Sequence, residues 1–432
     1  MNSVINVIKA LLTQPVIMIG ILILVGYIIG KEKPTKVITG TISGMVGIEM
    51  VIFGGSQFTS LFKPITTAVA DSFGIQGYIM DSYAMKATTQ EALGDKFGYV
   101  GYVFVIAFAV NLLLVYFGKY THAKGIFLTG NAGVAHSQAI LWLVMAWLGL
   151  SDWSSILISG ILVGIYWAFS TTLAAGTIDK VTDGGGFTIG HNEQLGLWFF
   201  GKIAHLFGKP EDDAENLKLP GILSIFNNNV AATAIIMTVF VGAFMAPLGI
   251  SGIEELSGGT NWFAYIILIG IQFSMYMVIL LQGVRMMCAE LTKAFKGIQE
   301  KVVPNAIPAI DVAALLPYSQ NAATLGFIFC TLGTVISILI LLVTGSPIMV
   351  LPGFVPLFFS GGPVGVVANK FGGIKSVIVC CLLLGIIQTF GTVWAITLMQ
   401  YPAGTGWSGM FDFCTFWPAV TEGLKFVGSL IH

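Results

Sequence analysis

The stretch VTDGGGFTIGHNEQ, at positions 181–194, has residue types that could bind a small polar ligand. Its glycines give the backbone access to left-handed conformations and let it approach a ligand closely. His191 and Asn192 add side-chain hydrogen-bond donors and acceptors to that backbone. The alternative interpretation is that His191 is only hydrogen-bonded within a buried network. We therefore treat this stretch as a candidate binding segment.

Two aspartates are the next candidates, because both lie in surroundings too apolar for ordinary surface loops. Asp81 occurs in GYIMDSYA, followed directly by Ser82 and Tyr83, and Asp311 occurs in IPAIDVAA. An ionisable side chain at membrane depth is costly and marks a functional site by default. Asp311 could bind a ligand hydroxyl or act as a base on it. For both aspartates the alternative is a carboxylate that caps a helix end at the membrane interface.

The composition indicates that these residues belong to an integral membrane protein. Hydrophobic residues make up 56% of the 432-residue chain and charged residues only 9%. The mean hydropathy is +0.88, far from the balance of a soluble domain. The net charge of −1 gives no reason to expect nucleic acid, and the chain has no Walker A motif for nucleotide-driven transport. Its 5 cysteines lie in or beside apolar segments without metal-like spacing, so neither a metal nor a cofactor is expected.

Apolar stretches close to the ~20 residues that a spanning helix needs predict about 11 transmembrane helices. They are 11–30, 37–54, 99–117, 126–150, 153–173, 230–250, 262–284, 323–343, 347–359, 376–399 and 416–431. Prolines in 347–359 favour a broken helix there. The stretches 55–98 and 285–320 are too polar for lipid and too apolar for free loops, which predicts re-entrant or amphipathic interfacial helices. Lysine-rich connections place the N-terminus outside and the segment 201–229 in the cytoplasm.

The two halves of the chain resemble each other weakly. GYIMDSYA pairs with IPAIDVAA, and IYWAF before GGGFTIGH pairs with TVWAI before GTGWSGM. We expect a first repeat at 1–200, the cytoplasmic connection at 201–229, a second repeat at 230–414 and a C-terminal helix at 415–432, all in one membrane domain. Because five spans per repeat is an odd number, the second copy must be inverted, with the substrate site near the midplane. The expected fold is an all-α polytopic membrane protein of two inverted five-helix repeats, which brings His191 towards Asp311.

Several long motifs support a family resemblance: VTDGGGFTIGH, LQGVRM with AEL shortly after it, IPAID, PGFVPLFFS and VVANKFGG. Together they strongly resemble the ascorbate-type membrane subunit IIC of the bacterial phosphoenolpyruvate-dependent phosphotransferase system, from about Gly26 to the C-terminus. The resemblance implies an inverted-repeat fold with a core and a dimerising V-shaped part, hence a homodimer in the bacterial plasma membrane. It also implies that the subunit binds a small sugar or sugar acid from outside. A cytosolic partner subunit, IIB, then phosphorylates the ligand during its passage.

The resemblance carries several binding residues onto this sequence unchanged. The aspartate of the IPAID motif is Asp311, and the histidine of the GFTIGH motif is His191. The tyrosine of the family's DTYA element is Tyr83. We therefore expect these three residues to bind the ligand.

Other expected binding positions depart from the family pattern. Asn192 replaces the usual glutamine after the histidine, and Ser82 replaces the threonine of DTYA. Asn131 stands where a histidine follows LTG, and Ala135 and His136 replace a glutamine pair further along that helix. His136 is expected to face the same site as Asn131. Because these departures cluster at positions that should face the ligand, they concern its identity rather than the transport class.

We therefore expect a permease subunit for L-ascorbate or a related small sugar acid or polyol. The resemblance implies that a small soluble IIB protein, supplied by IIA, carries the phosphate on a cysteine. No stretch of this sequence is long enough for such a soluble domain, so the chain is expected to be a phosphotransferase component whose phosphoryl donor lies on a partner. The alternative is an ion-coupled secondary transporter of a small polar organic substrate, with Asp81 or Asp311 as the coupling carboxylate.

Overall fold

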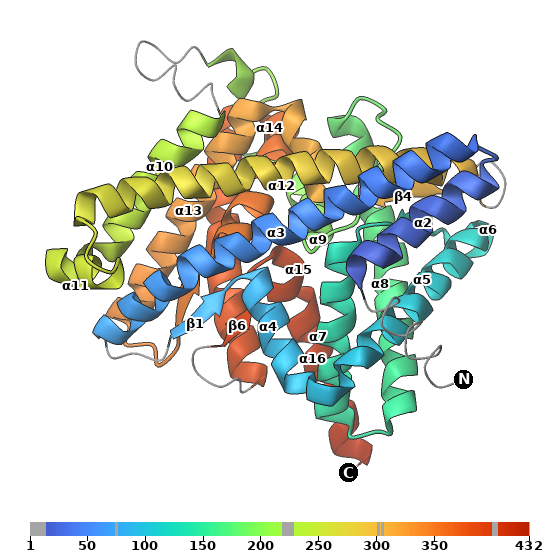
Figure 1. Ribbon diagram of the computed structural model, residues 1–432, viewed down its shortest axis with the longest axis horizontal. Coiled ribbons are helices and arrows are strands. Elements are labelled where there is room, and N and C mark those ends of the chain that lie inside the picture. Colours follow the sequence, from blue (N-terminus) through green and yellow to red (C-terminus); the bar gives the residue numbers. More distant parts are fainter. Residues whose placement is uncertain are drawn as a thin grey trace.

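The described part of the protein is mostly helical, as its long apolar stretches predict (Figure 1). The computed structural model describes residues 14–73, 77–217, 229–299, 303, 306–399 and 405–431. The α-helices are α2 (Pro15–Ile29), α3 (Pro34–Phe73), α4 (Ser82–Leu93), α5 (Tyr99–Tyr116), α6 (Gly118–Thr121), α7 (Gly130–Leu148), α8 (Asp152–Val181), α9 (Gln194–Ile203), α10 (Asn229–Met245), α11 (Gly249–Leu256), α12 (Trp262–Gln299), α13 (Gln320–Val343), α14 (Phe354–Met399), α15 (Phe411–Cys414) and α16 (Phe416–Ile431). Shorter 3-10 helices are η1 (Gly94–Gly98), η2 (Ala204–Leu206), η3 (Ala214–Asn216), η5 (Ala246–Leu248) and η6 (Val312–Tyr318).

Among the described residues, 5 helical stretches are long and apolar enough to cross a membrane. They are Ala84–Tyr116, Asp152–Val181, Met237–Leu256, Gln320–Val343 and Val355–Met399. The last of these contains a break at Gly373, whose φ of 66° and ψ of −166° are not helical. These stretches support a multi-pass membrane protein, while the count of about 11 spans stays a prediction.

Several expected boundaries are wrong. α3 runs from Pro34 to Phe73, so the expected end of a span at residue 54 falls inside one helix. α12 likewise continues past residue 284. The physical reason is that the backbone hydrogen bonds of a helix continue through polar residues, so a change in polarity does not end it. The stretch 347–359 is a strand, β5 (Met349–Pro352), followed by the start of α14, rather than a broken helix.

Six short strands, which the sequence analysis did not predict, form two parallel three-stranded sheets in the described part of the chain. They are β1 (Gly77–Met80), β2 (Gly125–Phe127), β3 (Thr188–Ile189), β4 (Ile307–Ile310), β5 and β6 (Gly406–Trp407). The first sheet has the order β5-β1-β6 and the second the order β2-β4-β3. Each half of the chain therefore supplies the central strand of one sheet and both outer strands of the other. Because β5 is an outer strand, it tolerates Pro352, which has no N–H for a ladder.

The parallel strands bring residues from distant parts of the sequence to the same sheet edge. In the second sheet, Thr129 lies just after β2, His191 just after β3 and Asp311 directly after β4. In the first sheet, Asp81 follows β1 and Ser408 follows β6. The carboxyl ends of parallel strands are a common place for ligand-binding groups.

The two long helices α3 and α12 pack against each other across one face of the molecule (Figure 1). Their approach requires a glycine at position 47, because a Cβ atom there would lie 2.6 Å from the backbone nitrogen of Met287 and 2.7 Å from the carbonyl oxygen of Gly283. α2 joins this pair through a hydrogen bond from the Tyr27 hydroxyl to the carboxylate of Glu290. The three helices thus form one packed group.

Candidate functional site

The edge of the second sheet brings two of the expected binding residues together. The Nε2 atom of His191 lies 4.0 Å from the Oδ2 atom of Asp311, and both residues are buried. The register that pairs Ile189 with Ile310 determines this approach, together with a 2.8 Å hydrogen bond from the Gly190 N–H to the Ile310 carbonyl. A buried imidazole and carboxylate at this separation can both contact one polar ligand.

His191 keeps one ring nitrogen available for a ligand. Its backbone N–H donates to the Gln194 side-chain oxygen at 3.0 Å, but its ring Nδ1 is buried and has no hydrogen-bond partner among the described residues. Burial lowers the pKa of His191, and the charge of Asp311 opposes this shift. The ring is therefore neutral at pH 7 and can both donate and accept. Buried polar atoms are normally paired, and the described part of the protein supplies no network partner for this Nδ1 atom.

Both aspartates also cap helix starts, as the alternative interpretation of each predicts. The Oδ1 atom of Asp311 accepts a 3.0 Å hydrogen bond from the Ala313 N–H at the start of η6. The Oδ1 atom of Asp81 accepts a 3.4 Å hydrogen bond from the Ala84 N–H in the first turn of α4. For Asp311, capping and ligand binding are compatible, because its other oxygen is the one that faces His191.

Asn131 contacts a lysine that the sequence analysis missed. Its Oδ1 atom accepts a hydrogen bond from the Nζ atom of Lys86 in α4. A 2.6 Å hydrogen bond from the Gln138 amide to the Thr89 hydroxyl also links α7 to α4. Lys86 lies one helical turn after Ser82, on the same face of α4. The sequence feature that could have identified Lys86 as a site residue is its position as the one basic residue in the stretch DSYAMKATTQ.

The ring of His136 packs among aromatic side chains. Its Nδ1 atom accepts a 3.2 Å hydrogen bond from the Trp167 indole, and its ring stacks on Phe413 with centroids 5.4 Å apart. Its Nε2 atom is buried and has no hydrogen-bond partner within the described part of the chain. Its ring also contacts that of Phe127 in β2, with centroids 5.6 Å apart. His136 therefore lies beside the second sheet.

The remaining expected residues are divided between the two sheets. The side-chain oxygen of Asn192 is buried without a partner among the described residues, and its backbone carbonyl accepts a 3.2 Å hydrogen bond from the Asp412 N–H. The Ser82 hydroxyl lies 2.8 Å from the Ser408 hydroxyl, at the edge of the first sheet. Tyr83 is in α4, but its side chain lies outside the described residues.

Two buried carboxylates join the segments after β3 and β6: Glu193, which lies in the candidate binding segment, and Asp412, which the sequence analysis missed. Glu193 accepts hydrogen bonds from the Ser360 hydroxyl at 2.6 Å and from the Phe411 N–H at 2.9 Å, so it holds the start of α15. Asp412 accepts a 3.1 Å hydrogen bond from the Leu195 N–H, so it holds the start of α9. We call this reciprocal arrangement the carboxylate clasp. It fixes the segment that carries His191 against the second half of the chain.

The clasp residues lie in connections outside the candidate membrane spans. Burial raises the pKa of Glu193 to about 8, and the charge of Asp412 adds to this rise. Burial also raises the pKa of Asp412 to about 7, and its hydrogen bond from the Tyr166 hydroxyl opposes the rise. One oxygen of Glu193, Oε1, has no hydrogen-bond partner in the described part of the structure. These features favour a protonated Glu193 at neutral pH.

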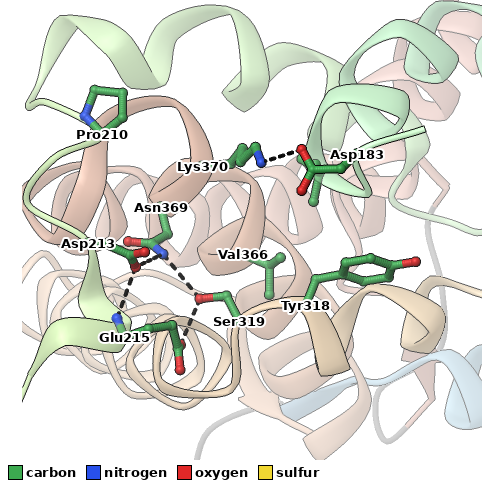
Figure 2. A pocket seen from close by; sticks show the side chains of 10 residues that line it. Asp183, Pro210, Asp213, Glu215, Tyr318, Ser319, Val366, Asn369 and Lys370 are labelled. Atoms are coloured by element: carbon green, nitrogen blue, oxygen red, sulfur yellow. Dashed lines mark hydrogen bonds and ion pairs between the residues drawn. The ribbon is translucent and has the colours of Figure 1, made fainter. Parts of the chain in front are cut away.

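A pocket of about 350 Å³ lies at a different place (Figure 2). It is lined by Val181, Asp183, Pro210, Asp213, Glu215, Tyr318, Ser319, Val366, Asn369 and Lys370. Figure 2 shows the ion pair between Lys370 and Asp183, with 2.8 Å between Nζ and Oδ1. None of the expected binding residues lines this pocket. Among the described residues there is also no group of three or more His, Cys, Asp or Glu side chains that could hold a metal ion.

Asn369, in the VVANKFGG motif, ties the connection at 209–217 to the helices behind it. Its Oδ1 atom accepts a 2.9 Å hydrogen bond from the Ala214 N–H. Its amide group donates to Asp213 at 2.6 Å and to Ser319 at 3.1 Å, as Figure 2 shows. The Ser319 hydroxyl in turn donates to Glu215 at 2.7 Å. We call residues 209–217 the strap. The hydrogen bonds of Asn369 hold the strap against α14 and the start of α13.

Comparison with known proteins assigns the chain to a family. The family EIIC-GAT, described as a PTS system sugar-specific permease component, matches residues 10–419. The chain belongs to this family. This finding confirms the resemblance seen in the motifs. As an EIIC-GAT permease component with several apolar helices, the chain is a multi-pass integral membrane protein of the bacterial plasma membrane.

The EIIC-GAT chain is similar to a relative whose name states its substrate. The "Ascorbate-specific PTS system EIIC component" of Mycoplasma pneumoniae is 28% identical over 422 residues. The match covers 87% of this chain and 64% of that relative, so the chain spans less than two thirds of the relative's length.

Proposed function

We propose that this IIC subunit binds L-ascorbate or a related small sugar acid or polyol at the edge of the second sheet. The observation that carries this proposal is a group of buried polar atoms around the Asp311–His191 pair that lack hydrogen-bond partners in the described structure. They are Thr129 Oγ1, His136 Nε2, His191 Nδ1 and Asn192 Oδ1. Because buried polar groups are normally paired, a ligand with several hydroxyl groups would satisfy them. The named substrate of the relative supports a sugar acid.

In this proposal each expected residue has a role at the ligand. Asp311 accepts a hydrogen bond from a ligand hydroxyl or acts as a base on it. His191 lies on the other side of that hydroxyl. The remaining binding residues are Ser82, Tyr83, Asn131, His136 and Asn192.

We further propose that a separate IIB protein, charged by IIA, phosphorylates the ligand during its passage. Phosphoryl transfer depends on positioning and charge stabilisation, which the fixed Asp311–His191 pair can supply. The cysteines of the described chain, Cys330, Cys380, Cys381 and Cys414, are all buried, which favours a phosphoryl donor on the partner. The strap belongs to the segment predicted to be cytoplasmic, so we expect the pocket that it helps to line (Figure 2) to be on the face from which IIB would approach.

The two interlocked sheets support the inverted repeat. In this comparison β1 corresponds to β4, β2 to β5 and β3 to β6. If each strand is replaced by its counterpart, the order β5-β1-β6 of the first sheet becomes β2-β4-β3, the order of the second. Each central strand is also followed directly by an aspartate and a helix, Asp81 with α4 and Asp311 with η6. Repeats of this kind place substrates at their interface. We retain the repeats at 1–200 and 230–414, and a homodimer, as parts of the proposal.

The second candidate is an ion-coupled secondary transporter, favoured by the buried carboxylate of Asp311 beside a histidine. Uptake of labelled L-ascorbate into membrane vesicles separates the two. The phosphotransferase mechanism predicts uptake that requires phosphoenolpyruvate and the soluble partners, survives a protonophore and delivers phosphorylated product. Uptake that collapses with the ion gradient and delivers unmodified ligand would refute it.

A further inference from the structure

The carboxylate clasp lies directly beside His191 in the chain. Glu193 follows His191 by two residues, and its Oε2 atom accepts the N–H of the first residue of α15 at 2.9 Å. Asp412 accepts the Leu195 N–H at 3.1 Å, and its own N–H donates to the Asn192 carbonyl at 3.2 Å. The backbone on both sides of Glu193 is therefore tied to α15, together with two of the residues that we propose to bind the ligand.

The two carboxylates of the clasp are fully buried, each with 0% of its surface exposed, and have acidic or neutral neighbours. Among the ion pairs of the described residues, none joins a lysine or an arginine to either carboxylate. The titratable groups that interact electrostatically with Glu193 are Tyr166 in α8, Cys330 in α13, Cys381 in α14, and Asp412 and Cys414 in α15. Tyr166 and Cys414 also interact with Asp412. None of these groups can carry a positive charge. Because neighbouring buried charges of the same sign oppose each other, the closed clasp favours a single negative charge.

The hydrogen bonds favour that charge on Asp412 and a proton on Glu193. Asp412 accepts hydrogen bonds from the Leu195 N–H and the Tyr166 hydroxyl. The Oε1 atom of Glu193 has no hydrogen-bond partner in the described part of the chain, and it packs against Gly196, where a Cβ atom would lie 2.5 Å from it. An ionised carboxylate with an unpaired buried oxygen is costly. Burial accordingly raises the pKa of Glu193, and the charge of Asp412 raises it further.

We propose that Glu193 is a positioning residue for His191 and that its proton keeps the clasp closed, so that the site binds its ligand more tightly at pH 6 than at pH 8. This inference rests on the proposed function and adds its regulation by pH. When the clasp opens, Glu193 meets water and releases its proton to the solvent, so a rising pH favours the open form. In the open form the segment of His191 is no longer tied to α15, and its 4.0 Å approach to Asp311 is no longer fixed.

Amide hydrogen exchange of the purified full chain in detergent measures the opening of the clasp without any ligand. Leu195 and Phe411 are the reporters, because their N–H groups donate to the clasp carboxylates. Their exchange rates are divided by the intrinsic rate at each pH. Between about pH 5 and pH 8, opening of the wild type should increase by about 10-fold per pH unit, since the closed clasp holds one proton that the open clasp releases.

Two variants isolate the proton of Glu193. Glu193→Gln keeps the shape of the protonated acid but has no such proton, so its opening should not change with pH. Glu422→Gln changes an exposed carboxylate of α16 and should behave like the wild type. Opening of the wild type that does not change with pH would overturn the inference. An equal increase in the wild type and Glu193→Gln would also overturn it, because the titrating group would then lie elsewhere.

Binding of L-ascorbate connects the clasp to the ligand site. This probe keeps one negative charge from pH 6 to pH 8, so its own charge does not change. The affinity of the wild type should fall by about 3–100-fold over this range, where the upper limit is what the release of one proton permits. The affinity of Glu193→Gln should change by less than about 2-fold. A wild-type affinity that is the same at both pH values would show that the clasp does not position His191.

Asp412→Asn provides a second test should Glu193→Gln not fold. This variant removes the charge that opposes ionisation of Glu193, so the closed clasp loses its proton at a lower pH. The increase in opening should therefore end at a lower pH than in the wild type, and an unchanged end point would overturn the inference. Failure of the proposed function is a distinct result, in which amide exchange shows the pH-dependent opening but the wild type does not bind L-ascorbate and vesicles show no phosphoenolpyruvate-dependent uptake.

Discussion

Replacing Glu193 by alanine should destabilise the protein, whereas replacing it by glutamine should not. The Oε2 atom of Glu193 accepts hydrogen bonds from the Ser360 hydroxyl and the Phe411 N–H, and alanine would leave both donors buried and unpaired. Each unpaired buried donor costs about 1–3 kcal/mol, so the expected loss in the free energy of unfolding is about 2–6 kcal/mol. Glutamine has the same shape as the protonated side chain and keeps one oxygen for both donors.

The measurement is the thermal unfolding midpoint of the purified full chain in detergent. For a chain of this length, an unfolding entropy of about 2.1 cal/mol/K per residue converts the loss into a decrease of about 2–7 °C for Glu193→Ala. Below about pH 4.5, where Glu193 is protonated in the folded and the unfolded protein, Glu193→Gln should stay within about 1 °C of the wild type. The control Glu422→Ala, which removes an exposed carboxylate from α16, should also stay within about 1 °C. If Glu193→Gln were as unstable as Glu193→Ala, the clasp would require an ionised carboxylate and the reasoning would fail.

The wild type and Glu193→Gln, compared at different pH values, also test the pKa of Glu193. Because burial raises this pKa from 4.5 to about 8, the folded protein holds a proton that the unfolded chain releases at lower pH. The contribution of Glu193 to stability is therefore present below about pH 4.5 and is lost as the pH rises to about 8. Relative to Glu193→Gln, which has no such proton, the wild type should lose stability over this window. A difference between the two midpoints that does not change with pH would contradict the raised pKa.

Further substitutions test the site and the strap. Asp311→Asn should abolish vesicle uptake without loss of expression, because asparagine can still cap η6 but has no carboxylate; normal uptake would remove Asp311 from the site. Asn369→Ala should speed amide exchange of the strap by about 30–1000-fold, the equivalent of about 2–4 kcal/mol for its three hydrogen bonds. Asn216→Ala, at an exposed position of the strap, is the control, and equal exchange in the two variants would show that Asn369 does not hold it. Asn131→His combined with Ala135→Gln should raise the affinity for L-ascorbate in a binding assay, since it restores the family pattern; an unchanged ligand profile would show that these positions do not set specificity.

The long helices are predictable from the sequence, and the strands are not. α5 and α16 lie within a residue of the expected spans at 99–117 and 416–431, because a long apolar stretch in a membrane has few alternatives to a helix. A strand of two to four residues has no periodicity that separates it from a helical turn. Its partner is also remote, since Ile79 pairs with Leu351. The sheets therefore depend on tertiary contacts that local patterns do not encode.

The residues of the candidate site likewise fall into those that the sequence predicts and those that it does not. Asp311 and His191 could be predicted because each lies in a long, specific motif, and the sheet register then places them 4.0 Å apart. The contacts of Lys86 and Glu193 could not be predicted, because the position of a charged residue in the sequence does not indicate its partner. Those partners are Asn131 on another helix and Phe411 in the other half of the chain.

The exchange of central strands has a consequence for how the protein is made. β1 has no neighbours within its own half, so it stays unpaired during synthesis until Met349 and the residues after it have been added. The outer strands β2 and β3 likewise wait for β4. The first half must therefore remain in the membrane in an incompletely folded state, since the sheet edge that we propose to face the ligand forms only after the second half has been added. A chain divided between the halves should give a working transporter only when both pieces insert in the same membrane.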